Sequence, residues 1–437
     1  MLPVILEGKL SSDVGYFNFG PKIRCYGRSS TGSRTAQLKS AVEDVSGAIV
    51  VTDRKVALPF NPTEVIDNLR LERYAKDVRM GEFVQKLVTR TYYLLRPMLG
   101  VEIRKHMQRA WLHLWNKLPF PVWPVDRTVE DICGKILTLS LEAQGLQRIP
   151  FIWFWPNSAT GCVMMTHDIE TSAGLNACSW LMDLDDAFGM KASFQVVPEG
   201  RYQVSPQLLS TICRRGFEVA IQDLNHDGLL FLDREEFLRR CKKINQYARE
   251  YGARGFRAAV LYRRQEWYDA LEFSFDMSIP NVAHFSAQPG GCCTVMPYFI
   301  GNILELPVTT TEDYTLFNVL GDYSIDLWKT QTELILQNNG LVSFIIHPDY
   351  ILKDNARAVY ESLLHYLQGL RAEMNLWFVL PSEIERWWRA RARMHIIPEG
   401  SSWRIEGDGA EKAVLAYAKI GEGKLVYEIS ASSIGSN

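Results

Sequence analysis

Apolar runs alternate with amphipathic segments over a long stretch of the chain, from residue 150 to residue 393. Runs such as KASFQVV and LVSFII have few polar positions, which is typical of parallel strands buried on both faces of a sheet. Between them, apolar residues recur every three or four positions, which predicts amphipathic helices. Seven or eight such units favour an α/β fold with a (β/α) barrel over residues 150–393 rather than an open sheet. The predicted helices are 128–144, 174–188, 205–215, 233–251, 265–271, 324–338 and 354–373, followed by a terminal helix from residue 382.

The chain before this region has a different pattern. Residues 1–75 carry short β-like runs around a Gly/Ser/Arg-rich loop and predict a small α+β module. Asn61 and Thr63 are candidate helix caps within it. Residues 76–149 predict a helical linker region, whose basic and aromatic run 90–115 could lie on a membrane surface or pack on the barrel. A proline and a glycine interrupt that run, which favours packing.

Two further stretches complete the predicted organisation. Residues 63–117 have mostly helical periodicity, with many Arg, Lys and Trp residues. Residues 394–437 turn polar, with apolar alternation between Gly-containing turns, and predict a short C-terminal β appendage.

Composition and charge narrow the classes of partner. The 437 residues are 47% hydrophobic and 22% charged, which is ordinary for a globular protein. The formal net charge of −2 provides no positive field that would hold nucleic acid or an anionic bilayer. We therefore expect no nucleic-acid partner.

Cysteines and apolar segments bear on the compartment. The eight cysteines include no C-x-x-C pair, and we expect them to be buried reduced thiols, as in a cytoplasmic protein. The first residues lack the basic and then apolar pattern of a secretion signal. The longest apolar runs, such as IPFIWFW, fall well short of the roughly 20 residues of a membrane span, so we expect no transmembrane segment.

Polar side chains follow several of the predicted strands. In a parallel barrel, the carboxyl ends of the strands form one mouth, where active sites lie. The strand ends contribute Asp168 and Glu170, then Gln222 and His226, then Arg257, Glu305 and finally His347.

This ordered set resembles the polysaccharide deacetylase family, the NodB-homology enzymes of carbohydrate esterase family 4, over roughly residues 160–385. The matching features are an Asp-x-Glu segment on the first strand, a segment that corresponds to His-x-x-x-His, an Arg after Gly-Phe and a late strand that ends in His. The resemblance implies a general base, Asp168, held by Arg257 through a charge-assisted hydrogen bond, and a general acid, His347. It also implies a divalent ion, with zinc expected, whose ligands would be Glu170, Gln222 and His226.

The implied reaction is hydrolysis of the N-acetyl amide of a sugar in surface-glycan metabolism. A divalent cation polarises the carbonyl and lowers the pKa of bound water to about 7, a base takes the water proton, and an acid protonates the leaving amine. An N-acetylated glycan would be the substrate. Peripheral association with membrane enzymes of glycan assembly is compatible with this expectation.

The sequence departs from the family at one ligand. Gln222 stands where the family has a histidine, and an amide oxygen binds zinc more weakly than an imidazole. His167, Asp223 or Asp227 could supply a replacement, although neighbouring strand residues face opposite sides, which places His167 away from Asp168. The alternatives are a weakened enzyme that uses a harder ion, or a glycan-binding or regulatory barrel without turnover.

Other residues have two interpretations each. Glu305 could line the pocket or form an ordinary salt bridge. Three aromatic residues near strand ends could stack on a sugar or belong to the core: Tyr262, Trp267 and Tyr314.

Overall fold

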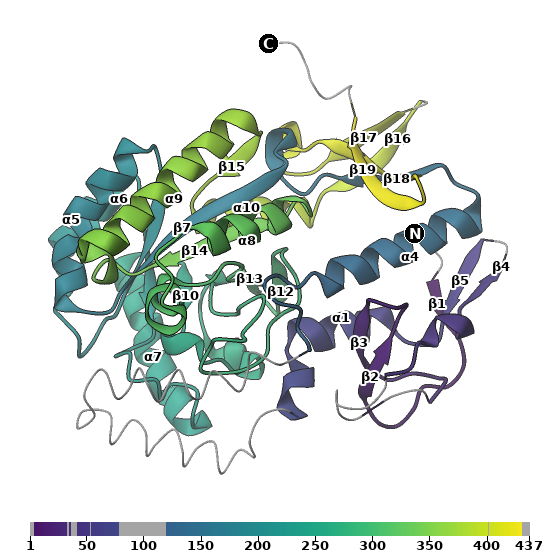
Figure 1. Cartoon of the computed structure of the whole chain (residues 1–437), viewed down its shortest axis with the longest axis horizontal. Helices are drawn as coiled ribbons and strands as arrows, with labels where there is room; N and C mark the ends of the chain where they lie inside the picture. Colours follow the sequence, from purple (N-terminus) through teal and green to yellow (C-terminus); the bar gives the residue numbers. More distant parts are fainter. Residues whose placement is uncertain are drawn as a thin grey trace.

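The computed structural model describes residues 4–32, 35, 42–52, 54–77, 119–400 and 402–430 (Figure 1). The helix predicted over 63–117 begins as α1 (Pro62–Arg70), which Asn61 caps by accepting from the main-chain N–H groups of Thr63 and Glu64. It continues as a 3₁₀ turn, η2 (Arg73–Asp77). The rest of that prediction, with the run 90–115, lies outside the described residues.

The centre of the fold is a curled, mostly parallel sheet. The strands run in the order β12-β13-β11-β10-β9-β8-β7-β14, and β15 also pairs with β7. Only β12 is antiparallel to its neighbour among these nine strands. Their bounds are β7 Gly161–Ile169, β8 Ala192–Val196, β9 Glu218–Gln222, β10 Gly255–Arg257, β11 Phe275–Asp276, β12 Tyr298–Ile300, β13 Ile303–Glu305, β14 Leu341–Ile346 and β15 Leu376–Phe378.

Side-chain hydroxyl groups join the two ends of this sheet. No main-chain ladder connects β13 to β14 in the described part of the chain. Instead, Thr309 N–H donates to Ser343 Oγ at 2.8 Å, and Thr309 Oγ1 donates to the carbonyl of Leu341 at 2.8 Å. Thr310 Oγ1 donates to the carbonyl of Ser343 at 2.7 Å. The predicted (β/α) barrel is therefore confirmed as a curled sheet, but this junction is made by side chains.

Helices cover the outer face of the sheet, as the periodicity predicts. They are α5 Ser172–Ala187, α6 Pro206–Arg214, α7 Arg234–Tyr251, α8 Asp326–Leu336 and α9 Asp354–Glu373. Helix α10 (Pro381–Arg391) packs instead against the inner residues Cys162 and Met164 through Ile384 and Trp387. Thr171, Ser205 and Asp233 accept main-chain hydrogen bonds at the starts of α5, α6 and α7, which fixes where these helices begin. The predicted helix 265–271 is instead a 3₁₀ turn, η6 (Gln265–Ala270).

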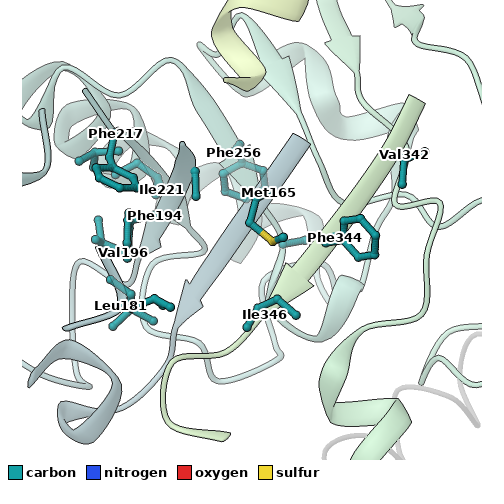
Figure 2. Packing of buried hydrophobic residues seen from close by; sticks show 14 of the residues in the cluster. Met165, Leu181, Phe194, Val196, Phe217, Ile221, Phe256, Val342, Phe344 and Ile346 are labelled. Atoms are coloured by element: carbon teal, nitrogen blue, oxygen red, sulfur yellow. The ribbon is translucent and has the colours of Figure 1, made fainter. Parts of the chain in front are cut away.

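Alternation along β7 separates the core from the site. Val163 and Met165 face the helices, where they join a cluster that includes Leu181, Phe194 and Phe344 (Figure 2). The alternate positions Cys162 and Met164 belong to a second cluster. Farther along the strand, the same inner series continues with Thr166 and Asp168, so that this face is apolar at the start of the strand and polar at its end.

The N-terminal part contains two small sheets and a long helix. Its elements are β1 Val4–Leu6, β2 Gly15–Asn18, β3 Arg24–Gly27, η1 Val45–Ala48, β4 Val50–Thr52, β5 Lys55–Leu58 and α4 Thr128–Gln144. At the other end are β16 His395–Glu399, β17 Ser402–Glu406, η9 Ala410–Lys412, β18 Leu415–Gly421 and β19 Lys424–Ile429. Strand β6 (Arg148–Ile152) pairs with β18, so the run at residue 150 is in the C-terminal sheet and outside the barrel sheet. The division at residues 75, 149 and 393 stays a prediction.

A buried ion pair ties the N-terminal part to the barrel. Glu72 Oε2 accepts from Arg263 Nε at 2.6 Å, and Arg263 Nη2 contacts Glu72 Oε1. The N–H group of Gly291 also donates to Glu72 Oε1, at 2.6 Å. Both charged side chains are at most 2% exposed. Each charge has lost its hydration on burial, and its partner compensates for that loss.

Glu72→Ala is expected to lower the free energy of unfolding by about 3–5 kcal/mol, because it leaves the guanidinium of Arg263 buried without a partner. Urea unfolding followed by tryptophan fluorescence measures the change. Arg28→Ala is the control, since the pair Arg28–Glu64 is at the surface, with Arg28 44% exposed, and its loss should change the stability far less. Equal losses in the two variants would contradict the role of the buried pair.

Candidate functional site

The residues predicted for the site come together at one end of the sheet. Asp168 and Glu170 project from the end of β7, two positions apart and so on one side of the strand. His167 faces the other way: its Nε2 lies 2.8 Å from Asp185 Oδ2, and Asp185 Oδ1 accepts from Tyr360 at 2.6 Å. His167 is therefore not available to the cluster, as the strand alternation predicted.

Glu170 lies between the two histidines. Its Oε1 is 2.7 Å from Nε2 of His226 and 3.4 Å from Nε2 of His347. The contact with His226 has the distance of an ion pair but not the angles of a hydrogen bond, so the attraction is chiefly electrostatic. Burial favours the neutral acid, but the two imidazoles outweigh it and hold the pKa of Glu170 well below its ordinary value. Glu170 is thus an ionised carboxylate.

Asp168 is almost completely buried, with 3% of the residue exposed. Gln222 donates its side-chain N–H to Asp168 Oδ2 at 3.0 Å, while Oδ1 has no hydrogen-bond partner among the described residues. Burial raises the pKa of Asp168, although Arg257 and His347 oppose the shift. A carboxylate whose pKa is raised is a stronger proton acceptor than an exposed one.

Arg257 stands close to Asp168 but does not hold it as predicted. Its Nη1 lies 3.6 Å from Asp168 Oδ2, and its Nη2 donates to Thr166 Oγ1 at 3.1 Å. In the described part of the chain, Nη1 and Nε have no hydrogen-bond partner. The expected hydrogen bond is therefore replaced by an ion pair, which still favours the charged form of Asp168.

His347 has a carboxylate partner that the sequence reasoning missed. Asp313 Oδ1 lies 2.6 Å from Nδ1 of His347, and Asp313 Oδ2 accepts from the His347 main-chain N–H at 2.7 Å. A carboxylate accepts, so Nδ1 carries a proton and Nε2 faces the cluster. Burial lowers the pKa of His347, but Asp313 and Glu170 outweigh it and raise the pKa well above its ordinary value. The acidic residues after the strand ILELPV were the available signal for Asp313.

Gln222 and His226, as placed, do not fit the predicted ligand set of a cation. The amide nitrogen of Gln222, not its oxygen, faces Asp168 and Glu170, at 3.0 and 3.3 Å. Nη2 of Arg201 lies 3.3 Å from Nδ1 of His226 and donates to the His226 carbonyl at 2.5 Å. Because Arg can only donate, the neutral ring accepts at Nδ1 and keeps its proton on Nε2. The imidazolium form of His226 also has a proton on Nε2. In both the neutral and the charged form, an N–H group therefore lies where a metal would need the lone pair of Nε2.

A different set of atoms could hold a cation. One ligand atom each of Asp168, Glu170 and His347 lies within 4.8 Å of the other two. Because Nδ1 of His347 is bonded to Asp313, Nε2 of the neutral ring keeps a lone pair that can bind a metal. This arrangement is common in metal-binding histidines. Asp168 and His347 are, however, the residues predicted as base and acid. They cannot be ligands and proton carriers at once.

Other candidates have structural partners. Asp227 forms two hydrogen bonds with Arg240, at 2.8 and 2.9 Å, and is not part of the cluster. Asp223 is buried and accepts from the N–H group of Leu224 at 2.6 Å, and burial raises its pKa to about 6. Trp267 is partly buried and packs against Phe237 at the edge of the core cluster.

Glu305 is also held within the sheet. It lies beside Asp276 in neighbouring strands and accepts from the N–H group of Ile279 at 3.0 Å. Burial, and then Asp276, raise its pKa well above the ordinary value. Glu305 is therefore a buried acid within the barrel and forms no salt bridge among the described residues.

Comparison with known proteins gives structural likeness alone. No family model and no curated protein matches the chain. The chain is similar to a Mycobacterium smegmatis protein named as a polysaccharide deacetylase, with 18% identity, a TM-score of 0.46, and coverage of 57% of this chain and 98% of that one. It is also similar to Puue allantoinase, with 14% identity, a TM-score of 0.45, and coverage of 54% of this chain and 92% of that one. A Pseudomonas aeruginosa PAO1 protein named as a polysaccharide deacetylase is similar too, with 13% identity, a TM-score of 0.43, and coverage of 54% of this chain and 93% of that one. At these TM-scores, the likenesses do not decide the function.

Within the described ranges, no helix combines the length and the apolar character that crossing a bilayer requires.

Proposed function

We propose that this protein hydrolyses the amide bond of an N-acetylated sugar, releasing acetate and a free amine. The observation that carries the proposal is the convergence of two buried proton carriers, Asp168 and His347, on the ionised Glu170. Asp168 has a raised pKa and an oxygen without a hydrogen-bond partner among the described residues. His347 has a raised pKa, and its imidazolium form presents the proton of Nε2 to the cluster, because Nδ1 is bonded to Asp313. One group suits proton removal and the other suits proton donation.

The residues divide the reaction into two proton transfers. As water adds to the amide carbon, Asp168 removes the water proton, and the carbonyl becomes a tetrahedral centre. His347 then donates a proton to nitrogen as the carbon–nitrogen bond breaks. Arg257 favours the charged form of Asp168, while Asp313 orients the His347 ring and stabilises its charge.

A second candidate is a barrel that binds a glycan without turning it over. The observation that favours it is the set of hydrogen bonds around Gln222 and His226. Together with Arg201, they turn N–H groups toward the two carboxylates. In that arrangement, N–H groups of the protein itself occupy the positions beside Asp168 and Glu170.

Release of acetate from tri-N-acetylchitotriose separates the two candidates. We expect the full chain to release acetate, measured by an enzyme-coupled assay with zinc, cobalt or magnesium added or with a chelator. His347→Gln should lower the rate at least about a hundredfold, because glutamine donates no proton as an acid. Chitotriose without acetyl groups serves as the blank. Absence of acetate release under all of these conditions would reject hydrolysis of this substrate and favour the second candidate.

A further inference from the structure

A buried polar network lies behind the proposed base, between the sheet and its outer helices. Its three members are His167 of β7, Asp185 of α5 and Tyr360 of α9, all fully buried. Nε2 of His167 lies 2.8 Å from Asp185 Oδ2, and the Tyr360 hydroxyl donates to Asp185 Oδ1 at 2.6 Å. A carboxylate accepts, so the proton of the first contact belongs to Nε2 of His167. One carboxylate thus joins a strand to two helices.

The network meets the sheet where β7 and β14 cease to pair with each other. Their ladder ends at the pair of His167 with Ile346. Asp168 and His347 are the next residues of the two chains, so the proposed base and acid both follow this last pair. Nδ1 of His167 also lies 3.4 Å from the Ile346 carbonyl, which adds a side-chain contact to the main-chain pairing. The network therefore acts on the main chain directly beside both proton carriers.

Asp185 and Tyr360 extend this connection to the helices that follow the same two strands. Helix α5 comes after β7, and α9 comes after β14 and a 3₁₀ turn. The rings of Tyr360 and His167 meet edge to face, with 6.1 Å between centroids. Burial, and then Asp185, raise the pKa of Tyr360 well above its ordinary value, so the hydroxyl keeps its proton and donates. The strand–helix unit of the base is thereby joined to that of the acid.

Stability alone does not account for these polar groups. Their surroundings are apolar, since the ring of Tyr360 belongs to the main core cluster together with Phe194 and Phe344. Replacement of buried charged groups by apolar residues of similar volume often leaves stability equal or higher. A network with its hydrogen bonds formed rigidifies a core and specifies one arrangement. Its contribution is therefore a fixed distance and direction between the groups that it joins.

We propose that His167, Asp185 and Tyr360 are positioning residues, which hold the last pair of β7 and β14 so that Asp168 and His347 stay in place for the two proton transfers. This inference rests on the proposed function, because it concerns the base and acid of that reaction. The three side chains are fully buried and act through the main chain, without touching a substrate. A misplacement of about 1 Å can cost roughly 10² in rate. Loss of the network should therefore lower kcat and leave KM nearly unchanged.

Tyr360→Phe tests the network, because it removes one hydroxyl and keeps the ring. In the full chain, we expect kcat for acetate release from tri-N-acetylchitotriose to fall about tenfold, with KM within about twofold. Tyr74→Phe is the matched control. Tyr74 is also buried, but its hydroxyl donates to the Gly291 carbonyl at 2.7 Å, far from β7 and β14 in the fold. Urea unfolding should show similar losses of stability in the two variants, and only Tyr360→Phe should lose kcat.

Amide hydrogen exchange measures the same effect without turnover. The main-chain N–H of His347 donates to Asp313 Oδ2 at 2.7 Å, so its protection reports how the acid is placed. Peptides that cover residues 341–347 should exchange about five times faster in Tyr360→Phe than in the unchanged protein, and at the unchanged rate in Tyr74→Phe.

The outcomes separate the positioning role from the proposed function. Equal kcat values for Tyr360→Phe and Tyr74→Phe in an active protein would overturn the positioning role. Unchanged exchange over residues 341–347 in Tyr360→Phe would overturn it whether or not acetate is released. Faster exchange in that variant, when the unchanged protein releases no acetate, would support the placement of His347 by the network and reject only the hydrolysis.

Discussion

Asp168→Asn is expected to lower acetate release about a thousandfold while the protein stays folded. Asparagine has nearly the shape of aspartate but cannot accept the proton of the attacking water, and general bases contribute roughly 10²–10⁴-fold. The side chain is buried and already receives a hydrogen bond from Gln222, which the amide oxygen of asparagine can also accept. Initial rates and a thermal unfolding curve of each variant are the measurements.

Asp227→Asn is the matched control for that substitution. Asp227 belongs to the same loop as His226 but pairs with Arg240 and lies outside the cluster. Its activity should stay within about threefold of the unchanged protein, with some loss of stability from the broken ion pair. If Asp168→Asn keeps more than a tenth of the activity, Asp168 is not the base.

The pair of substitutions Gln222→His and Arg201→Met is expected to tighten zinc binding about a hundredfold beyond Gln222→His alone. The new histidine supplies an imidazole where an amide stands, and removal of Arg201 ends the hydrogen bond that keeps the proton on Nε2 of His226. Groups that orient a metal-binding histidine typically change affinity 10–100-fold. Competition with a chromophoric zinc chelator measures the dissociation constant of each variant.

A surface arginine provides the comparison for Arg201. Arg239 pairs with Glu236 on the exposed side of α7, so Arg239→Met combined with Gln222→His should bind zinc no better than Gln222→His alone. The same result for Arg201→Met would show that this arginine does not control His226. It would also remove the main physical reason to doubt the predicted ligand set.

Much of the fold follows from local patterns in the sequence. The signals are local in the helix caps Thr171, Ser205 and Asp233 and in the buried runs of β7 and β14. The predicted elements agree with the structure to within a few positions. Strands of two or three residues, such as β10 and β11, give little periodicity to detect. The pairing of β6 with β18 joins distant parts of the chain, which alternation alone does not reveal.

The sequence predicted the site residues that lie at strand ends, but not those that lie between the strands. Asp168, Glu170, His226 and His347 meet as the strand order implied. Arg201 comes from a loop and Asp313 from a helical turn after β13, and their effect depends on which nitrogen of an imidazole they reach. Which nitrogen is reached depends on the three-dimensional placement of the side chains. For the same reason, the sequence predicted Gln222 as a ligand oxygen, whereas its nitrogen faces the carboxylates.

The hydroxyl junction between the two ends of the sheet bears on how His347 and Asp313 are aligned. Asp313 follows β13 and His347 follows β14, so the acid and its orienting carboxylate come from the two sides of the junction. The residues that hold the two sides together are Thr309, Thr310 and Ser343. β14 keeps its register with β7 through a ladder from Leu341 to Ile346, whereas its register with the chain after β13 is fixed at a few points. A shift of that chain by one residue would bring other side chains to the junction and separate the carboxylate from its imidazole. The alignment of the proton donor therefore depends on three small side chains together with the two hydrogen bonds between Asp313 and His347.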